Sequence, residues 1–239
     1  ILIEKPLFEK RHIMTPKKNS YYIGYNLRYH PVIKQIRKII HRKEIWNVEM
    51  KQQSFLPDWR KNIKYYSSAT AKKSSGGGVL LELSHELDYV IKNFNLPTAV
   101  NGLLLNSNSL GIGVEDTAYI YMLNKNNSNI LPITFKLDFI RSDKKRLISV
   151  YTKKNSLMLD LNSSKIYYYN TNKWKVFKTF KHKINDTYKI MWNKILKNNK
   201  HNNLEDFINY NFNLINLIDK IKKSSSKKKM INVSKIDIV

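Results

Sequence analysis

The sequence predicts an α+β protein in which a fragment of parallel α/β structure precedes an open, largely antiparallel β-sheet with helices packed on one face. Two short apolar runs near the start, at 1–3 and 21–26, each stop at a charged or polar residue, as strands of a parallel sheet do. A series of short strands separated by turn residues follows from 117 to 180. Two amphipathic helices close the chain.

The first elements alternate strand and helix. The run 1–3 predicts a buried strand, and 21–26 predicts a second strand that breaks at its asparagine. Pro31 begins a helix, 31–43, because proline is favoured at the first helical position and apolar residues then recur at helical spacing. Residues 45–57 alternate in polarity and predict another strand, and a polar loop over 58–75 follows it.

The second half of the chain predicts a meander with one solvated face. The segments 117–124 and 130–140 flank the turn-rich sequence "KNNSN" and predict a hairpin. Within the second segment apolar and polar residues alternate from 133 to 139, as expected when one face of an antiparallel sheet meets water. Further short strands are predicted at 146–153, 156–162, 165–170 and 173–180.

The better of the two closing helices is predicted over 203–223. It carries an apolar stripe formed by Leu204, Phe207, Ile208, Ile215, Ile218 and Ile221. The sequence "SSSKKK" after it predicts a loose polar tail over 224–239, with room for a short terminal strand.

Composition bounds the class of protein. The chain has 43 Lys and Arg against 18 Asp and Glu, a net charge of +25, but its lysines are dispersed among asparagines and no nucleic-acid-binding motif accompanies them. A nucleic-acid-binding protein therefore stays an alternative that rests on charge alone. The absence of cysteine excludes disulfides. No apolar run could cross a bilayer and no signal-peptide pattern opens the chain, so we expect a cytoplasmic protein without a membrane partner.

The most informative segment is "SSGGGVLLELSHELDYV". As one helix over 79–94 it buries an apolar face and places Glu82, His85, Asp88 and Tyr89 on the opposite, solvated side. A carboxylate three residues away can fix the tautomer of His85 and raise its basicity, as proton transfer requires. The glycines at 76–78 allow a ligand or another backbone to approach the helix start. The alternative is a solvated histidine and a glycine turn.

Several motifs occur in a recognisable order: "EKP", "GYNLRYHP", "LPDWR", "GGGVLLELSHELDY", "VEDTA" and the late amphipathic helix. Together they resemble the Gfo/Idh/MocA family of NAD(P)-dependent sugar oxidoreductases, particularly members associated with bacterial surface-polysaccharide biosynthesis. The resemblance covers nearly the whole chain. It implies hydride transfer between a carbon of a sugar or sugar-nucleotide and the nicotinamide of NAD or NADP.

The resemblance also implies the domain organisation. Residues 1–30 would be the C-terminal remnant of a dinucleotide-binding Rossmann domain, 31–223 the substrate-binding and catalytic domain with its open sheet, and 224–239 the tail. The sheet of the family commonly packs against another subunit, so a homo-oligomer is expected. The missing N-terminal part of the Rossmann domain would bind most of the NAD(P).

Site residues follow from the motifs of the family. Lys5, between Glu4 and Pro6, matches the lysine beside the nicotinamide and the reacting hydroxyl, and His85 matches the proton-transferring histidine. An ammonium at Lys5 would stabilise negative charge that develops on the substrate oxygen, while a neutral His85 would accept the proton.

Other matches are less directly chemical. Asn26 and Arg28 match the segment that lines the cleft, and Trp59 with Arg60 matches a "WR" pair near the cofactor or substrate. For both arginines the alternative is a surface salt bridge, and for Trp59 it is a core aromatic.

Two departures from the family pattern limit the assignment. Many relatives carry an aspartate four residues before the histidine, where this chain has Leu81, so Glu82 or Asp88 replaces it or the relay is absent. The phosphate-binding G-x-G-x-x-G is also missing, and "GIG" at 111–113 lacks its third glycine. We therefore expect this chain alone not to hold NAD(P) tightly. A non-catalytic binding or oligomerisation remnant of the same family is the alternative.

Overall fold

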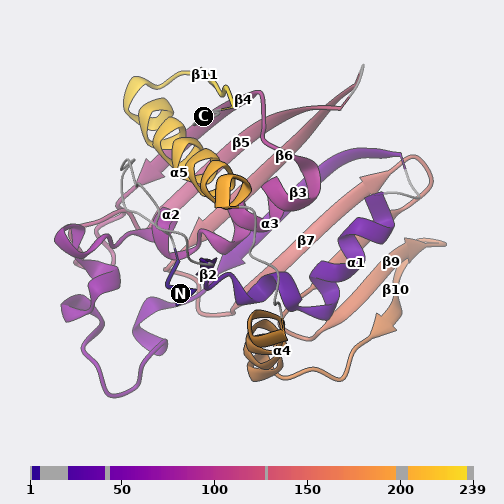
Figure 1. Ribbon diagram of the computed structural model, residues 1–239, viewed down its shortest axis with the longest axis horizontal. Helices are drawn as coiled ribbons and strands as arrows, with labels where there is room; N and C mark the ends of the chain where they lie inside the picture. Colours follow the sequence, from indigo (N-terminus) through magenta and orange to yellow (C-terminus); the bar gives the residue numbers. More distant parts are fainter. Residues whose placement is uncertain (1, 6–20, 41–43, 127–128, 198–203, 236–239) are drawn as a thin grey trace.

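The computed structural model describes residues 2–5, 21–40, 44–126, 129–197 and 204–235. Figure 1 shows a large twisted sheet with the helices gathered on one of its faces, while the other face is left uncovered. The predicted fold class is confirmed. In the described part of the chain, no helix is both long and apolar enough to span a membrane.

The main sheet has nine strands in the order β10-β9-β8-β7-β3-β6-β5-β4-β11. Every neighbouring pair is antiparallel except β3 and β6, which run parallel. The strands are β3 (Ile45–Gln53), β4 (Ala99–Leu105), β5 (Thr117–Asn126), β6 (Asn129–Asp138), β7 (Lys145–Thr152), β8 (Ser156–Asp160), β9 (Lys165–Asn170), β10 (Lys173–Thr179) and β11 (Ile231–Asn232).

A separate pair of strands lies at the start of the chain. β1 (Leu2–Ile3) and β2 (Tyr22–Ile23) run parallel, with Leu2 opposite Tyr22. Both predicted strands are present, but the second is shorter than expected. It ends at Ile23, and a 3₁₀ turn, η1 (Asn26–Tyr29), leads into α1 (Pro31–Ile40).

The remaining helices are α2 (Val79–Glu82), α3 (His85–Phe94), α4 (Ile184–Lys197) and α5 (Leu204–Lys227). The segment 58–75, predicted as a loop, contains the short 3₁₀ turns η3 (Tyr65–Ser67), η4 (Ala69–Ala71) and η5 (Lys73–Ser75), and η2 (Leu56–Asp58) precedes them. The core lies between the helices and the inward face of the sheet, where Leu80 and Leu87 are as fully buried as Met50, Ile133 and Leu137.

The prediction of a loose tail after 223 is wrong at its beginning. α5 continues through Lys227, and Ser224 is fully buried. Its hydroxyl accepts a 3.0 Å hydrogen bond from the Gly102 amide of β4 and donates one of 2.6 Å to the Lys229 carbonyl. The Ser225 hydroxyl accepts from the Leu104 amide at 2.9 Å. The two serines accept hydrogen bonds from backbone amides of β4, so these amides keep their partners inside the fold. This requires Ser224 and Ser225 to be held in place by α5.

Strand β4 was not predicted, and it carries the close contact between α5 and the sheet. A Cβ on Gly102 would come within 2.7 Å of Ile221 Cγ2 and 2.9 Å of the Ile221 carbonyl oxygen. Glycine at 102 therefore allows the helix to approach the strand backbone. The short terminal strand allowed for in the tail is present as β11, which pairs with β4.

The uncovered face of the sheet is partly apolar. Leu103 on β4 lies opposite Tyr119 on β5, and both are more than 40% exposed, as is Tyr121. The ammonium of Lys136 on β6 lies 5.5 Å from the centre of the Tyr119 ring. This group of four residues, Leu103, Tyr119, Tyr121 and Lys136, is called the open-face patch below.

Candidate active site

The helix around His85 is broken. Instead of one helix over 79–94, α2 ends at Glu82 and α3 begins at His85, with Leu83 and Ser84 between them. Across the break the Glu86 amide bonds to the Leu83 carbonyl, a three-residue step in place of the four-residue step of a continuous helix. The carbonyl of Glu82 is thus released from the helical pattern.

Lys5 binds the released carbonyl. The residue follows β1, and its Nζ donates a 2.6 Å hydrogen bond to the Glu82 carbonyl oxygen and lies 3.6 Å from Glu82 Oε2. The other carboxylate oxygen of Glu82 accepts from the Thr70 hydroxyl at 2.8 Å. The Lys5 side chain keeps 17% of its surface exposed. The structure therefore brings the ammonium to the α2–α3 junction, three residues before His85.

His85 lies in a site that favours its neutral form. Its Nδ1 is buried without a hydrogen-bond partner among the described residues, and its ring packs edge-on against Tyr25 with 5.5 Å between the centroids. Burial lowers the pKa of His85 well below its ordinary value, and the positive charges of Arg146 and Lys5 lower it further. At neutral pH the imidazole is uncharged and able to accept a proton.

The prediction that this side of the helix is solvated is wrong for Asp88 and Tyr89, which are both buried. Side chains of η1 and α5 cover Asp88. The guanidinium of Arg28 forms a bidentate pair with the Asp88 carboxylate through Nε and Nη2. The Tyr210 hydroxyl of α5 donates to Asp88 Oδ1 at 2.7 Å. Because Asp88 binds Arg28 and Glu82 binds Lys5, neither carboxylate serves as the partner of His85 Nδ1.

Arg146 is a residue near the site that sequence reasoning missed. It lies at the start of β7, and its Nε donates to Glu86 Oε1 at 2.8 Å, while the Tyr89 hydroxyl donates to the same oxygen at 2.9 Å. Glu86 is buried, and its Oε2 has no hydrogen-bond partner in the described part of the chain. The one signal in the sequence for a role of Arg146 near the site is its position at the start of a predicted strand.

Asn26 and Glu4 occupy supporting positions. Asn26 is buried, and its amide donates to the Thr187 hydroxyl of α4 at 2.8 Å, which fixes α4 against η1. Glu4 is exposed, and a Cβ on Gly24 would lie 3.3 Å from its Oε2. Pro6 lies outside the described residues.

Trp59 and Arg60 lie in the segment that follows β3. The indole of Trp59 donates to the Ser54 hydroxyl at 3.0 Å, and its ring packs edge-on against Phe139 at 5.2 Å, while Arg60 is exposed. Trp59 is therefore fixed to the end of the sheet, but it keeps 37% of its surface exposed and is not the core aromatic considered as its alternative.

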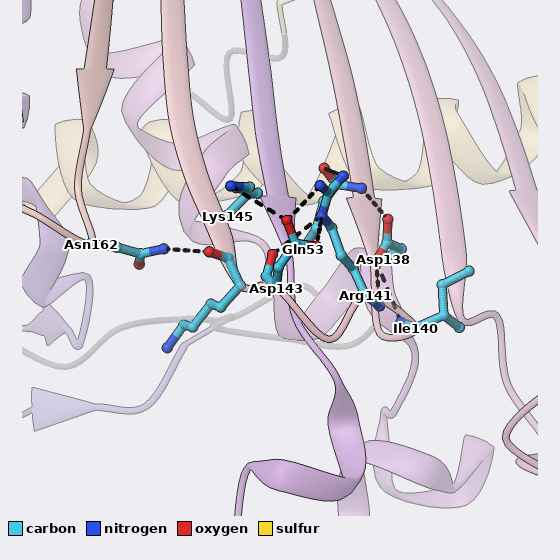
Figure 2. A network of polar contacts seen from close by, with 8 residues as sticks. Gln53, Asp138, Ile140, Arg141, Asp143, Lys145 and Asn162 are labelled. Carbon is cyan, nitrogen blue, oxygen red and sulfur yellow. Dashed lines mark hydrogen bonds and ion pairs between the residues drawn. The ribbon is translucent and has the colours of Figure 1, made fainter. Parts of the chain in front are cut away.

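A polar network holds the end of the sheet that Trp59 packs against (Figure 2). Gln53 of β3 donates to Asp138 Oδ2 of β6 at 2.5 Å, and Arg141 Nη1 lies 3.5 Å from Gln53 Oε1. Asp138 Oδ1 accepts from the backbone amide of Arg141 at 3.2 Å, and Arg141 pairs with Asp143. The side chains of Gln53, Asp138 and Arg141 bind one another or the backbone beside them. We therefore assign this network to the stability of the strand ends and not to substrate binding.

The glycine segment meets protein at the start of α2. A Cβ on Gly77 would overlap the carbonyl oxygens of Ala69 and Thr70, and one on Gly78, whose φ is +109°, would overlap the Glu115 carboxylate. The Val79 amide donates to the Glu115 carbonyl at 3.0 Å. Burial raises the pKa of the Glu115 carboxyl. The sequence allows either a ligand or another backbone to approach these glycines, and the structure shows a backbone, that of Ala69 and Thr70, beside Gly77.

The segment beside the glycines offers no pyrophosphate site. The 239 residues contain no G-x-G-x-x-G, and the helix start beside the glycines is filled by Glu115. A pyrophosphate therefore has no place at that helix start. In the described ranges, no cluster of three or more His, Asp or Glu side chains is arranged to hold a metal ion.

Comparison with known proteins supports the fold. No family model and no curated protein matches the sequence. Levoglucosan dehydrogenase in complex with NADH and levoglucosan is a similar solved structure, with a TM-score of 0.77 at 14% identity over 98% of this chain and 74% of that one. An NAD-binding oxidoreductase from Klebsiella pneumoniae gives a TM-score of 0.77 at 13% identity, again over 98% and 74%.

The transcriptional regulator Gal80p from Kluyveromyces lactis is also similar, with a TM-score of 0.75 at 15% identity over 99% of this chain and 70% of that one. The structural neighbours are thus Gfo/Idh/MocA-type NAD-binding oxidoreductases and Gal80. At these identities the likeness shows the fold, and the open sheet matches the C-terminal domain of such proteins.

Proposed function

We propose that this chain forms the substrate-binding and catalytic part of an NAD(P)-dependent oxidoreductase that acts on a hydroxyl or carbonyl of a sugar or sugar-nucleotide. The observation that carries the proposal is the Lys5 hydrogen bond to the Glu82 carbonyl, which holds an ammonium beside the junction that presents His85. A cation next to a neutral, unpaired imidazole suits the oxidation of an alcohol.

The two side chains divide the work. His85 accepts the proton of the substrate hydroxyl, for which its low pKa keeps it ready at neutral pH. Lys5 stabilises the negative charge that develops on the same oxygen. A nicotinamide cofactor, if bound beside these residues, would supply the acceptor for the hydride on the same carbon. In the reverse direction His85 returns the proton.

The proposal includes a division of the chain. Residues 1–30 would contribute the last part of the dinucleotide-binding domain, with β1 and β2 as its strands, and 31–223 would hold the substrate. The phosphate-binding part would come from protein outside these residues, and it would decide between NAD and NADP. The resemblance found in the motifs favours a cytoplasmic role in bacterial surface-polysaccharide biosynthesis.

We also propose that the protein is a homo-oligomer that associates through the uncovered face of its sheet. The open-face patch supports this, because large side chains such as Leu103 and Tyr119 are exposed on a flat surface. A symmetric pair of such faces would bury them against each other.

The second candidate is a non-catalytic binding module with the same fold. Leu81 at the relay position and Glu115 at the helix start favour it, as does a transcriptional regulator among the similar structures. The two candidates differ in turnover, because only the first requires both Lys5 and His85 to be present.

The test is an assay of sugar-dependent reduction of NAD⁺ and NADP⁺. It compares the complete natural protein with its Lys5→Ala and His85→Ala variants. We expect each variant to lower kcat by about 100-fold or more while the fold is retained. Lys38→Ala, an exposed lysine on α1, is the matched control and should leave kcat unchanged. Parental turnover in both variants would overturn the catalytic assignment, and no turnover with any sugar would favour the second candidate.

A further inference from the structure

A cavity of about 980 Å³ lies between β2 and η1 on one side and α4 and α5 on the other. Its volume is at the upper end of the range for small-molecule sites, about 300–1,000 Å³. Lys5, Glu82 and His85 are not among the residues that line it. The cavity therefore adjoins the candidate active site without containing its reacting groups, since Arg28 belongs to its wall, as does Tyr25, whose ring packs edge-on against His85.

The walls are unusually aromatic. Among the described residues, six rings from β2, η1 and α5 and the segments beside them line the cavity: Tyr21, Tyr22, Tyr25, Tyr29, Phe207 and Tyr210. Flat side chains of this kind bind the faces of planar rings by stacking, and a base stacked on an aromatic side chain gains about 1–3 kcal/mol. Arg28 lies over the rings of Tyr25 and Tyr210, and Tyr21 packs against Phe207, so a ring of the ligand would stack on Tyr22 of β2 and Tyr29 of η1.

The charged side chains in the described lining of the cavity are all positive. Arg28, Lys92, Lys194 and Lys197 contribute to it, and no aspartate or glutamate of that lining does. The Lys194 ammonium lies 5.5 Å from the centre of the Tyr29 ring, so a cation and an aromatic face are already adjacent on the α4 side. Arg28 is neutralised by Asp88 behind the wall, which leaves the lysines of α4 as the groups able to receive an anion.

We propose that this cavity is a binding site for a nucleoside phosphate. The ring of the base would stack on the tyrosines of β2 and η1, and the phosphate would bind Lys194 and Lys197 at the end of α4. This chemistry accounts for aromatic rings and lysines in one cavity wall that carries no described carboxylate.

The test is isothermal titration calorimetry of the intact protein with uridine 5′-monophosphate, ribose 5-phosphate and inorganic phosphate. We expect one nucleotide per chain, bound more tightly than ribose 5-phosphate, with inorganic phosphate weakest. Lys194→Ala with Lys197→Ala should weaken nucleotide binding by about tenfold or more, since two charge-assisted contacts are lost. Both lysines are exposed, so this variant should keep the parental melting temperature.

Two control variants show whether any loss of binding belongs to this cavity. Lys189→Ala together with Lys183→Ala removes the same charge from exposed positions outside the lining and should leave binding unchanged. Lys5→Met should also leave it unchanged, which distinguishes this cavity from the candidate active site. No binding at millimolar nucleotide, equal affinity for ribose 5-phosphate and the nucleotide, or equal weakening by the control pair would each overturn the proposal.

Discussion

The Nζ of Lys5 and the backbone carbonyl of Glu82 are joined by a 2.6 Å hydrogen bond. In an unbroken helix that carbonyl would accept the amide of Glu86, four residues on. The break at Leu83 and Ser84 releases it, and a lysine that follows the first strand takes the place of the helical donor. The interruption of the helix is therefore what joins the start of the chain to the segment that carries His85.

The ionisation of His85 should be measurable in the pH profile of kcat/KM. Its pKa is held below the usual value, so activity should fall with decreasing pH only below about pH 6.5, where a typical histidine would already be half protonated. Lys5→Met removes one of the charges that lower this pKa, so the acid limb of the remaining activity should move to higher pH. The limb should not move in Lys38→Met, and an unmoved limb in Lys5→Met would contradict the electrostatic coupling.

The pair formed by Arg28 and Asp88 should contribute strongly to stability. The Asp88 side chain is 1% exposed, so Arg28→Met leaves a buried carboxylate that keeps the Tyr210 hydroxyl as a donor but loses its cation. Since the Arg28 side chain is itself 28% exposed, we expect a loss of about 3 kcal/mol, the lower end for breaking a buried pair. Urea unfolding measures it. Arg37→Met, an exposed site on α1, should change stability by less than about 0.5 kcal/mol.

Gly102→Ala should destabilise the fold through the contact between α5 and β4. The new methyl group would meet both the side chain and the carbonyl oxygen of Ile221, so the helix must shift, at a loss of about 2 kcal/mol. Gly113→Ala is the matched control, because a Cβ at that position would meet no atom within 4 Å. Thermal or urea unfolding of both variants tests this, and equal midpoints would show that α5 does not press on β4.

Acid should destabilise the protein through His30. Burial, together with the neighbouring charges of His182 and Arg146, lowers the pKa of His30 to about 4, although a hydrogen bond with the Leu161 backbone and the charge of Asp160 act in the opposite direction. In the unfolded chain His30 takes up a proton near pH 6.5, and in the folded chain only near pH 4. The free energy of unfolding therefore has its full value above pH 6.5 and decreases as the pH falls from 6.5 to 4. The loss reaches about 3 kcal/mol. Unfolding of His30→Gln at both pH values should show a correspondingly smaller difference.

The open-face patch should control association. Tyr119→Glu places a carboxylate in the centre of the patch, where a second copy would have to bury it, so the variant should sediment as a monomer at concentrations where the parent associates. Tyr66→Glu changes a similarly exposed tyrosine away from the sheet and should leave the sedimentation unchanged. A parent that is monomeric at all concentrations would refute association through this face.

The sequence was sufficient for elements whose polarity is regular. The hairpin of β5 and β6 and the strands β7 to β10 are short apolar or alternating runs separated by turn residues, and the structure confirms them. Strand β4 was missed because its glycine and asparagine weaken the pattern, while its stability comes from α5, which lies far away in the sequence. The parallel pairing of β3 with β6 also depends on tertiary contacts that no local pattern records.

The sequence identified several residues of the candidate site but not the contacts that they make. Spacing placed Glu82, His85 and Asp88 on one solvated face, but periodicity assumes an unbroken helix, and Ser84 interrupts it. Arg28 and Tyr210 cover Asp88 from two other elements, so its burial could not follow from the helix alone. The link between Lys5 and Glu82 uses a main-chain oxygen, a partner that side-chain patterns do not reveal.

The position of β3 has a consequence for the order in which the protein forms. This strand lies between β6 and β7, both of which follow it by a long stretch of chain. During synthesis β3 leaves the ribosome without either neighbour, so the centre of the sheet closes only after β7 has emerged. Such distant pairing makes folding slow and leaves both edges of β3 open to wrong partners in the meantime.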